Sequence, residues 1–328
     1  MHCTKCGKRN ETSTKHCTGC GQKLMIAPKV GIGTYTVSVL IGILLAIFCT
    51  AFLTIFTIRG ALSENSISGM FDDLDIARLR VGRMLDLDGD AYRNNITLSE
   101  WIFSEMDDTF IRRYSMTVRD VENIATRLPL GRFVEDTLIR YGQGILQGNG
   151  NVNISSRDIL NFVEWNEHHF YRELNIQLLP RDYDDIEQFL FDNNINSATR
   201  LDSLLDNVNL SVSTLRWGLS WPALILLLAV IIGLSEIVFF IFKKKVCPTL
   251  VCDGTALTVA GILFTVLIFS LNSLVVRFSP VELDGRLVDA LLSGLRSVGT
   301  ITGLVASGLG IALIAASVML NFLQKRKS

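Results

Sequence analysis

The middle of the chain lacks two residue types. Between residues 59 and 216 there is no cysteine and no lysine, so arginine supplies the permanent positive charges of this segment. Without cysteine, this segment has no disulfide, so we expect packing to stabilise it. It holds 26 Asp and Glu against 16 Arg, a net charge of −10. Such an acidic surface repels polyanions, which argues against nucleic acid as a partner of this segment.

Charge is nearly absent from four long stretches, which are rich in Leu, Ile, Val and Phe. About 20 helical residues cross a hydrocarbon core ~30 Å thick. We therefore expect membrane-spanning helices over residues 37–58, 217–242, 254–276 and 297–324. A buried core helix is the alternative for any one stretch, but four with basic flanks favour a polytopic α-helical membrane protein.

The lysines predict the orientation. All ten lie before residue 30, at residues 243–245, or at 325 and 327. With four spans these segments share one side, which the basic residues assign to the cytosol. We expect a multi-pass plasma-membrane protein with both termini cytosolic and residues 59–216 extracytoplasmic. The remaining cytosolic parts are then the basic linker 25–36, the loop 243–253 and the tail 325–328.

Two Cys-x-x-Cys pairs, each followed by glycine, form the sharpest pattern in the chain: Cys3 and Cys6, then Cys17 and Cys20. Four thiolates in a tetrahedron suit Zn²⁺, so residues 1–24 predict a zinc ribbon with one structural ion. A pair of disulfides is the alternative, which a reducing cytosol disfavours. A redox Cys-x-x-Cys would need a thioredoxin-like βαβ context, which is absent.

The double Cys-x-x-Cys-Gly pattern, the basic linker and the following apolar helix resemble the zinc-ribbon membrane proteins common in Gram-positive bacteria. The resemblance covers about 60 residues. It implies zinc at the four cysteines and a bacterial plasma membrane. It implies nothing about the segment 59–216, and many such proteins have no assigned activity.

The segment 59–216 is long enough for one hydrophobic core and is expected to be mainly helical. Thr117 and Ser155 each precede an aspartate by three residues, a pattern typical of helix starts. We predict helices over residues 118–128, from Pro129 to about 141, from 155 onward, over 182–191 and over 198–206. Residues 142–153 are expected to be a loop, and 210–216 to run straight into the second span.

Two acidic patterns outside the membrane could bind metal. Residues 86–90 resemble the start of a calcium loop, but Ala91 and Thr97 replace the Gly and Glu that an EF-hand needs, which favours an acidic turn. His169 and Glu173 share a helix face, yet the HExxH pattern of zinc proteases is missing, which favours a solvated face.

Glu236 is the one acidic or basic residue inside a predicted span, roughly 10 Å from its cytosolic end. It is either functional or close enough to the interface to reach it. In the fourth span, Gly299, Gly303 and Ser307 form a small-residue stripe for close helix packing, with a homo-oligomer contact as the alternative. Residues 279–282 resemble a helix start, which predicts an amphipathic helix over 277–296 on the outer membrane surface.

No catalytic pattern is present: neither a GxSxG nucleophile motif nor a P-loop occurs. Cys49, Cys247 and Cys252 are expected to be unpaired thiols. We therefore expect a non-enzymatic protein that binds, senses or scaffolds, with membrane lipid around it and protein partners on one or both sides. The alternative is a transport-related subunit, because the order of spans and outer domain is similar to that of FtsX-like permeases.

Overall fold

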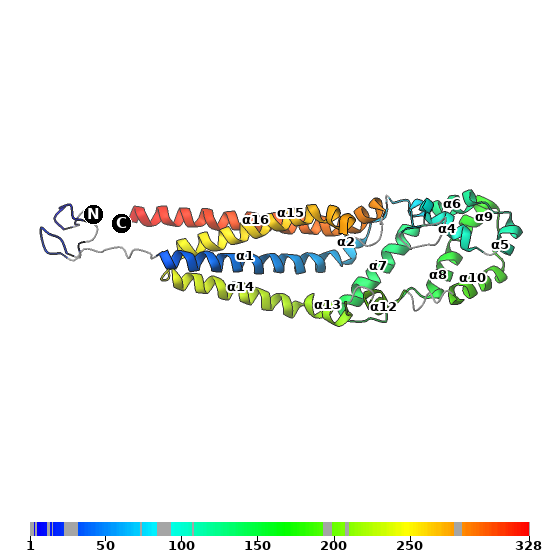
Figure 1. Cartoon of the computed structure of the whole chain (residues 1–328), viewed down its shortest axis with the longest axis horizontal. Coiled ribbons are helices and arrows are strands. Elements are labelled where there is room, and N and C mark those ends of the chain that lie inside the picture. The colour runs from blue at the N-terminus through cyan, green and yellow to red at the C-terminus, as the bar shows by residue number, and fades with distance from the viewer. Residues whose placement is uncertain are drawn as a thin grey trace.

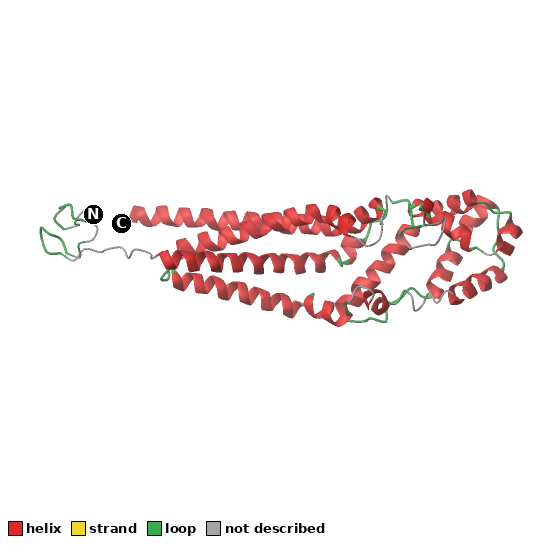
Figure 2. Cartoon of the chain, viewed as in Figure 1, coloured by secondary structure: helices red, strands yellow, loops and turns green. Residues whose placement is uncertain are grey.

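The computed structural model describes residues 3, 5–11, 14, 16–22, 32–72, 74–83, 93–106, 108–192, 199–206, 210–278 and 284–327. Across these residues the chain is helical, without strands (Figure 2). Long helices form a bundle, and a group of short helices extends from one end of it (Figure 1). Both chain termini lie at the opposite end of the bundle (Figure 1).

The bundle contains α1 (Ile32–Ala61), α14 (Trp221–Ile241), α15 (Val246–Phe278) and α16 (Gly285–Lys327). The short helices, which we call the outer domain, are α2 (Glu64–Ile67), η1 (Ile76–Arg78), α4 (Leu98–Glu105), α5 (Asp108–Tyr114), α6 (Val118–Arg127), α7 (Leu130–Gln147), α8 (Ser156–Trp165), α9 (Glu167–Leu174), α10 (Pro180–Asp192), α12 (Leu201–Asp206) and α13 (Val212–Gly218).

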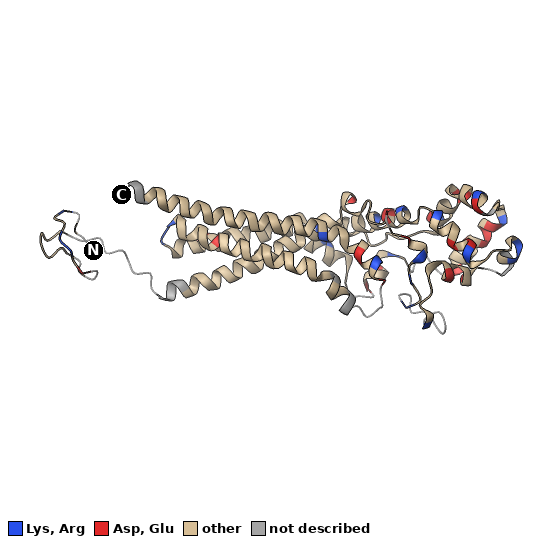
Figure 3. Ribbon diagram, turned by 90° about the horizontal axis from the view of Figure 1, so that it is seen from above, with Lys and Arg blue, Asp and Glu red and all other residues tan. Residues whose placement is uncertain are grey.

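Four helices are long and apolar enough to cross a membrane: Thr36–Ala61, Trp221–Ile241, Val246–Leu271 and Gly285–Gln324. The prediction of four apolar helices is therefore confirmed. Most of their large apolar side chains are exposed on the outside of the bundle, as a lipid solvent requires. Charged residues are dense in the outer domain and sparse in the bundle (Figure 3).

The third apolar helix begins earlier than predicted. α15 starts at Val246, so residues 246–253 are helical and not a loop. The turn before it is short, because Lys243 and Lys244 adopt positive φ values of 54° and 64° and end α14. Pro248 falls in the first turn of α15, where a missing N–H breaks no helical hydrogen bond. Asp253 thereby becomes a residue of a helix that is long and apolar enough to cross a membrane.

Residues 285–296 of the predicted surface helix 277–296 form one continuous helix, α16, with the predicted fourth span 297–324, and residues 277 and 278 belong instead to the end of α15. α16 has 43 residues. The predicted start at residues 279–282 lies outside the described residues. No proline interrupts 285–327, and Gly294 is held by packing, since a Cβ there would lie 2.8 Å from the Ser66 carbonyl oxygen. At 1.5 Å per residue α16 is about 64 Å long, well beyond the ~30 Å of a hydrocarbon core.

The small-residue stripe of α16 packs against α15 of the same chain. A Cβ on Gly261 would lie 2.7 Å from the carbonyl oxygen of Gly303, and one on Gly254 would lie 2.7 Å from that of Gly310. The two backbones therefore approach as closely as glycine permits. This face is covered by α15 within one chain, as close helix packing requires, and the homo-oligomer contact stays the alternative prediction.

The predicted helix starts at Thr117 and Ser155 are confirmed. Each hydroxyl accepts the amide of the aspartate three residues later, and that carboxylate accepts the amide of the capping residue. Thr97 and Glu100 form a third capping box, at the start of α4. These reciprocal bonds satisfy amides that a helix N-terminus would otherwise leave unpaired.

Two predicted features of the outer domain are wrong. α7 does not end near residue 141 but continues to Gln147, because Gly142 and Gly144 serve close packing and do not break the helix. A Cβ on Gly142 would lie 3.0 Å from the Leu62 carbonyl oxygen. Residues 210–216 do not run straight into the second span either: α13 ends at Gly218, and Ser220 caps a separate helix.

The outer domain has an apolar core made by residues far apart in sequence: Met116, Val121, Ile124, Ile176 and Leu178. Asp182, at the start of α10, is fully buried beside it. Its carboxylate pairs with Arg113, and accepts the Tyr114 hydroxyl at 2.6 Å and the Leu179 amide at 2.8 Å. This network fastens α5 to α10.

Candidate metal centre and outer contact

The two cysteine pairs fold in the same way. In the first turn the Gly7 amide donates to the Cys3 carbonyl at 2.9 Å, and in the second the Gly21 amide donates to the Cys17 carbonyl at 2.9 Å. Both glycines have positive φ, +71° and +72°, a conformation that side chains disfavour. The glycine after each pair is therefore required by the backbone of the turn.

These turns bring the four cysteine sulfurs together. All four Sγ atoms lie within 4.8 Å of one another, with 3.5 Å between Cys3 and Cys20 and 3.4 Å between Cys6 and Cys17. A tetrahedral ion with metal–sulfur bonds of about 2.3 Å would hold its ligands about 3.8 Å apart. The sulfur set thus fits a tetrahedral metal.

Asn10 supports the site from between the two pairs, a role that the sequence did not reveal. Its side chain is buried, and its Nδ2 donates to the Lys8 carbonyl at 2.8 Å and to Cys17 Sγ at 3.4 Å. Its Oδ1 accepts the Thr18 amide at 2.9 Å. The Asn10 side chain thereby links the two cysteine turns and orients the Cys17 sulfur.

The surroundings of Cys17 favour a thiolate. The Gly19 amide donates to its sulfur at 3.3 Å, and Asn10 adds a second donor. These donors outweigh the cost of desolvation and lower the pKa of Cys17 to about 6. Thiolate is the form of cysteine that binds metal.

The chain matches no family model, no curated protein and no solved structure.

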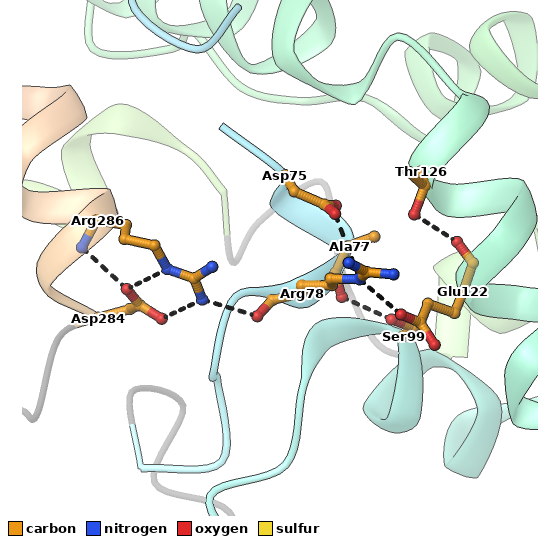
Figure 4. Close-up of polar contacts among 8 residues, drawn as sticks. All are labelled: Asp75, Ala77, Arg78, Ser99, Glu122, Thr126, Asp284 and Arg286. Carbon is orange, nitrogen blue, oxygen red and sulfur yellow. Dashed lines mark hydrogen bonds and ion pairs between the residues drawn. The ribbon is translucent and has the colours of Figure 1, made fainter. Parts of the chain in front are cut away.

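A polar contact joins the start of α16 to the outer domain (Figure 4). Arg286 donates from Nη2 to the carbonyl of Arg78 at 3.1 Å and pairs with Asp284 at 3.0 Å. Asp284 Oδ2 in turn accepts the Arg80 amide at 3.4 Å. Burial raises the pKa of Asp284, but Arg286 and the Arg80 amide outweigh it and the pKa is lowered. We call these residues the outer contact.

The contact continues into the outer domain core. Arg78 pairs with Glu122 of α6 at 2.7 Å, and Ser99 of α4 donates to the carbonyl of Ala77 at 2.6 Å (Figure 4). The three-residue helix η1 is thus held on one side by α4 and α6 and on the other by Arg286. Sequence reasoning missed this, because partners about 200 residues apart leave no local pattern.

Glu236 lies on α14 and is exposed, so it faces outward from the bundle. A second carboxylate, Asp253 on α15, accepts a hydrogen bond from Ser235 Oγ. The Asp253 Oδ1 atom is buried and has no hydrogen-bond partner among the described residues. The prediction that Glu236 is the one ionisable residue of the spans therefore needs correction.

The two acidic patterns outside the bundle are expected to be an acidic turn and a solvated helix face, not metal sites. Residues 86–90 lie outside the described residues. Glu173 is 3.9 Å from Arg127, and the rings of His168 and His169 are tilted to each other with centroids 4.1 Å apart. Among the described residues, the four cysteines alone form a group of three or more such side chains close enough to hold a metal. Cys49, Cys247 and Cys252 are free thiols, as expected.

Proposed function

We propose that this protein is a non-enzymatic membrane module that links an extracytoplasmic domain to a cytosolic partner. In this proposal the chain crosses the plasma membrane four times, with the cysteine-bearing N-terminus and the C-terminus in the cytosol. The lysines support this orientation, since they lie on the N-terminal segment, the α14–α15 turn and the tail. The outer domain, which holds no lysine, then lies outside.

The metal at the four cysteines is proposed to be zinc, in a structural role. Four sulfur donors suit Zn²⁺, and a set of four leaves no open position for a substrate. Cys3, Cys6, Cys17 and Cys20 would hold the ion and Asn10 would orient Cys17. A segment this short has no apolar core, so metal binding would supply most of its folding energy.

The observation that carries the proposal is the outer contact at the start of α16. Arg286 and Asp284 bond the backbone of Arg78 and Arg80, and from there α16 continues without a break to Lys327. A change of position of η1 would therefore act directly on a helix that reaches the opposite end of the bundle. Binding at the outer domain could be reported on the other side in this way.

Site-directed photocrosslinking in cells tests the proposal. One probe replaces Arg9, an exposed residue of the cysteine-bearing segment, and another replaces Trp165, which is 76% exposed on the outer domain. We expect each probe to capture a different protein. A Cys17→Ser, Cys20→Ser variant should lose the Arg9 product and keep the Trp165 product.

Failure of both probes to capture any protein would contradict the proposal. Capture of a nucleotide-binding subunit through the cytosolic probe would select the alternative, a transport-related subunit. That alternative is favoured by one observation: the order of one apolar helix, a large outer domain, two apolar helices, a short connection and a last helix is that of FtsX-like permeases.

A further inference from the structure

Arg59 lies in the last turn of α1, at the end of the bundle that meets the outer domain (Figure 1). Its Nη1 donates to the Leu219 carbonyl, in the short connection between α13 and α14, at 2.7 Å. Its guanidinium carbon lies 4.6 Å from the centroid of the Trp221 ring. A hydrogen bond and an aromatic face therefore hold this charged group in one place between α1 and α14.

The rest of the Arg59 guanidinium is open. No carboxylate pairs with Arg59 among the described residues. Its Nε and Nη2 atoms donate to none of these residues and are not buried either. These two nitrogens lie on the same edge of the planar group and form the fork that binds a carboxylate or a phosphate through two hydrogen bonds. A fixed positive charge with this edge open is suited to an anion.

The side chains around Arg59 are those of a membrane interface. Trp217 and Trp221 are 69% and 56% exposed, at the start of a helix long and apolar enough to cross a membrane. Tryptophan is enriched at the level of the lipid headgroups. One turn further along α14, Ile225 shares a face with Trp221 and is also exposed. An anion at Arg59 thus lies above an uncovered apolar surface.

This combination favours a phospholipid over a soluble anion. A soluble anion would use Arg59 and leave Trp221 and Ile225 uncovered. The phosphate group of a lipid has two free oxygens that can accept both N–H groups of the fork. Its acyl chain would cover the apolar face of α14 at the same time.

We propose that Arg59 binds the phosphate group of one anionic phospholipid in the leaflet next to the outer domain, with an acyl chain along Ile225. An anionic headgroup is preferred because a zwitterionic one carries its own ammonium, which competes with Arg59 for the phosphate. The site requires that the bundle crosses a membrane, as proposed above. It depends neither on the orientation of the chain nor on zinc or protein partners.

An apolar photocrosslinking amino acid in place of Ile225 tests the site in the full chain. The chain is placed in phosphatidylcholine nanodiscs that contain a small fraction of phosphatidylglycerol with the same acyl chains. After illumination, mass spectrometry counts the two captured lipids. We expect the captured share of phosphatidylglycerol to exceed its share of the bilayer at least about fivefold. Captured phosphatidylcholine shows that residue 225 faces lipid.

Two pairs of variants assign this enrichment to the site. Arg59→Gln should reduce the captured phosphatidylglycerol to its share of the bilayer and keep the capture of phosphatidylcholine, because only the charged fork is lost. Arg119→Gln, at an exposed arginine of α6, should keep the enrichment. Trp221→Leu leaves the guanidinium unstacked and should lower the enrichment about two- to fivefold. Trp165→Leu, at an exposed tryptophan of α8, should not change it.

Glycerol 3-phosphate in millimolar excess distinguishes a lipid from a soluble phosphate. We expect the enrichment to persist in its presence, and loss of the enrichment would assign Arg59 to a soluble phosphate and contradict the lipid site. Capture of the two lipids in proportion to their shares of the bilayer, or equal enrichment with and without Arg59→Gln, would overturn the proposal and leave the membrane crossing intact. Capture of no lipid at all would contradict the membrane crossing as well.

Discussion

At the scale of single residues, the cysteine cluster shows how little sequence a metal centre needs. Two turns of the same geometry, each closed by a glycine with positive φ, place four sulfurs within 4.8 Å of one another. Because the spacing and the glycines are local, this part of the site could be predicted. Asn10 could not, since its role depends on where Cys17 lies in space.

The cysteines give the first prediction. Purified wild-type protein should carry about one zinc per chain, and Cys17→Ser, Cys20→Ser should carry almost none, because two remaining thiolates cannot complete the tetrahedron. Metal analysis by mass spectrometry checks this. Cys247→Ser, at a thiol outside the cluster, should keep its zinc. Equal zinc in the double variant and the wild type would exclude the site.

The second prediction concerns Asp182, which is fully buried and paired with Arg113. Asp182→Asn leaves the Arg113 guanidinium with the exposed and more distant Asp185, at 3.9 Å, as its charge partner. The change should destabilise the outer domain, toward the lower end of about 3–5 kcal/mol because Arg113 is partly exposed. Hydrogen exchange of α5 and α10 in the full chain measures the loss. Asp184→Asn, an exposed neighbour on α10, should change stability by less than about 0.5 kcal/mol. Similar exchange in both variants would contradict the assigned role.

At the scale of elements, helix starts were easier to predict than helix ends. Thr117 and Ser155 signal their helices through a hydroxyl and an aspartate three residues later, so the signal is complete within four positions. In a sequence, a glycine such as Gly142 or those of α16 can indicate either the end of a helix or a close contact between helices. Only the position of the neighbouring element shows which of the two applies. The prediction placed Asp253 outside the third apolar helix. Its partner Ser235 comes from another helix, so no local pattern indicates where Asp253 lies.

The packing of α15 on α16 gives the third prediction. A Cβ on Gly261 would lie 2.5 Å from Ser307 Oγ and 2.7 Å from the Gly303 carbonyl oxygen, so Gly261→Ala must push the helices apart. We expect a lower melting temperature, with an overpacking cost of about 1–3 kcal/mol. Gly308→Ala on α16 is the control, because nothing lies within 4 Å of its added Cβ. A melting temperature that falls equally in both variants would refute this packing.

The capping box of α8 gives the fourth prediction. Burial raises the pKa of Asp158, but its bonds to Ser155 and its pairing with Arg140 outweigh this and lower the pKa below the ordinary 3.8. The ionised form therefore stabilises the fold above pH 3.8, and that contribution is lost as the pH falls through the lowered pKa. The contribution should be about 1 kcal/mol or less, since the pair is partly exposed.

Thermal unfolding of the wild type and Asp158→Asn across a pH series checks it. The two melting temperatures should differ at pH 6 and converge in strong acid. A constant difference at every pH would show that the Asp158 charge has no role.

At the scale of the whole molecule, α16 connects the outer domain to the opposite end of the bundle. It begins at the outer contact, packs along α15 through small residues, and ends at the same end of the bundle as the N-terminus (Figure 1). Its length of about 64 Å is roughly twice the thickness of a hydrocarbon core, so this one helix is long enough to cross a membrane and still meet the outer domain. This arrangement supports a protein that relates events on two sides of a membrane.

The most direct test of that account is the sidedness of the chain. In a variant whose native cysteines are replaced by serine, single cysteines are introduced at Asn149, exposed in the outer domain, or at Lys245, exposed in the α14–α15 turn. Intact cells are treated with a membrane-impermeant thiol reagent, and permeabilised cells serve as the reference. We expect Asn149→Cys to react in intact cells and Lys245→Cys to react only after permeabilisation. Labelling of Lys245→Cys in intact cells while Asn149→Cys stays protected would contradict the proposed orientation and, with it, the link between an outer domain and a cytosolic partner.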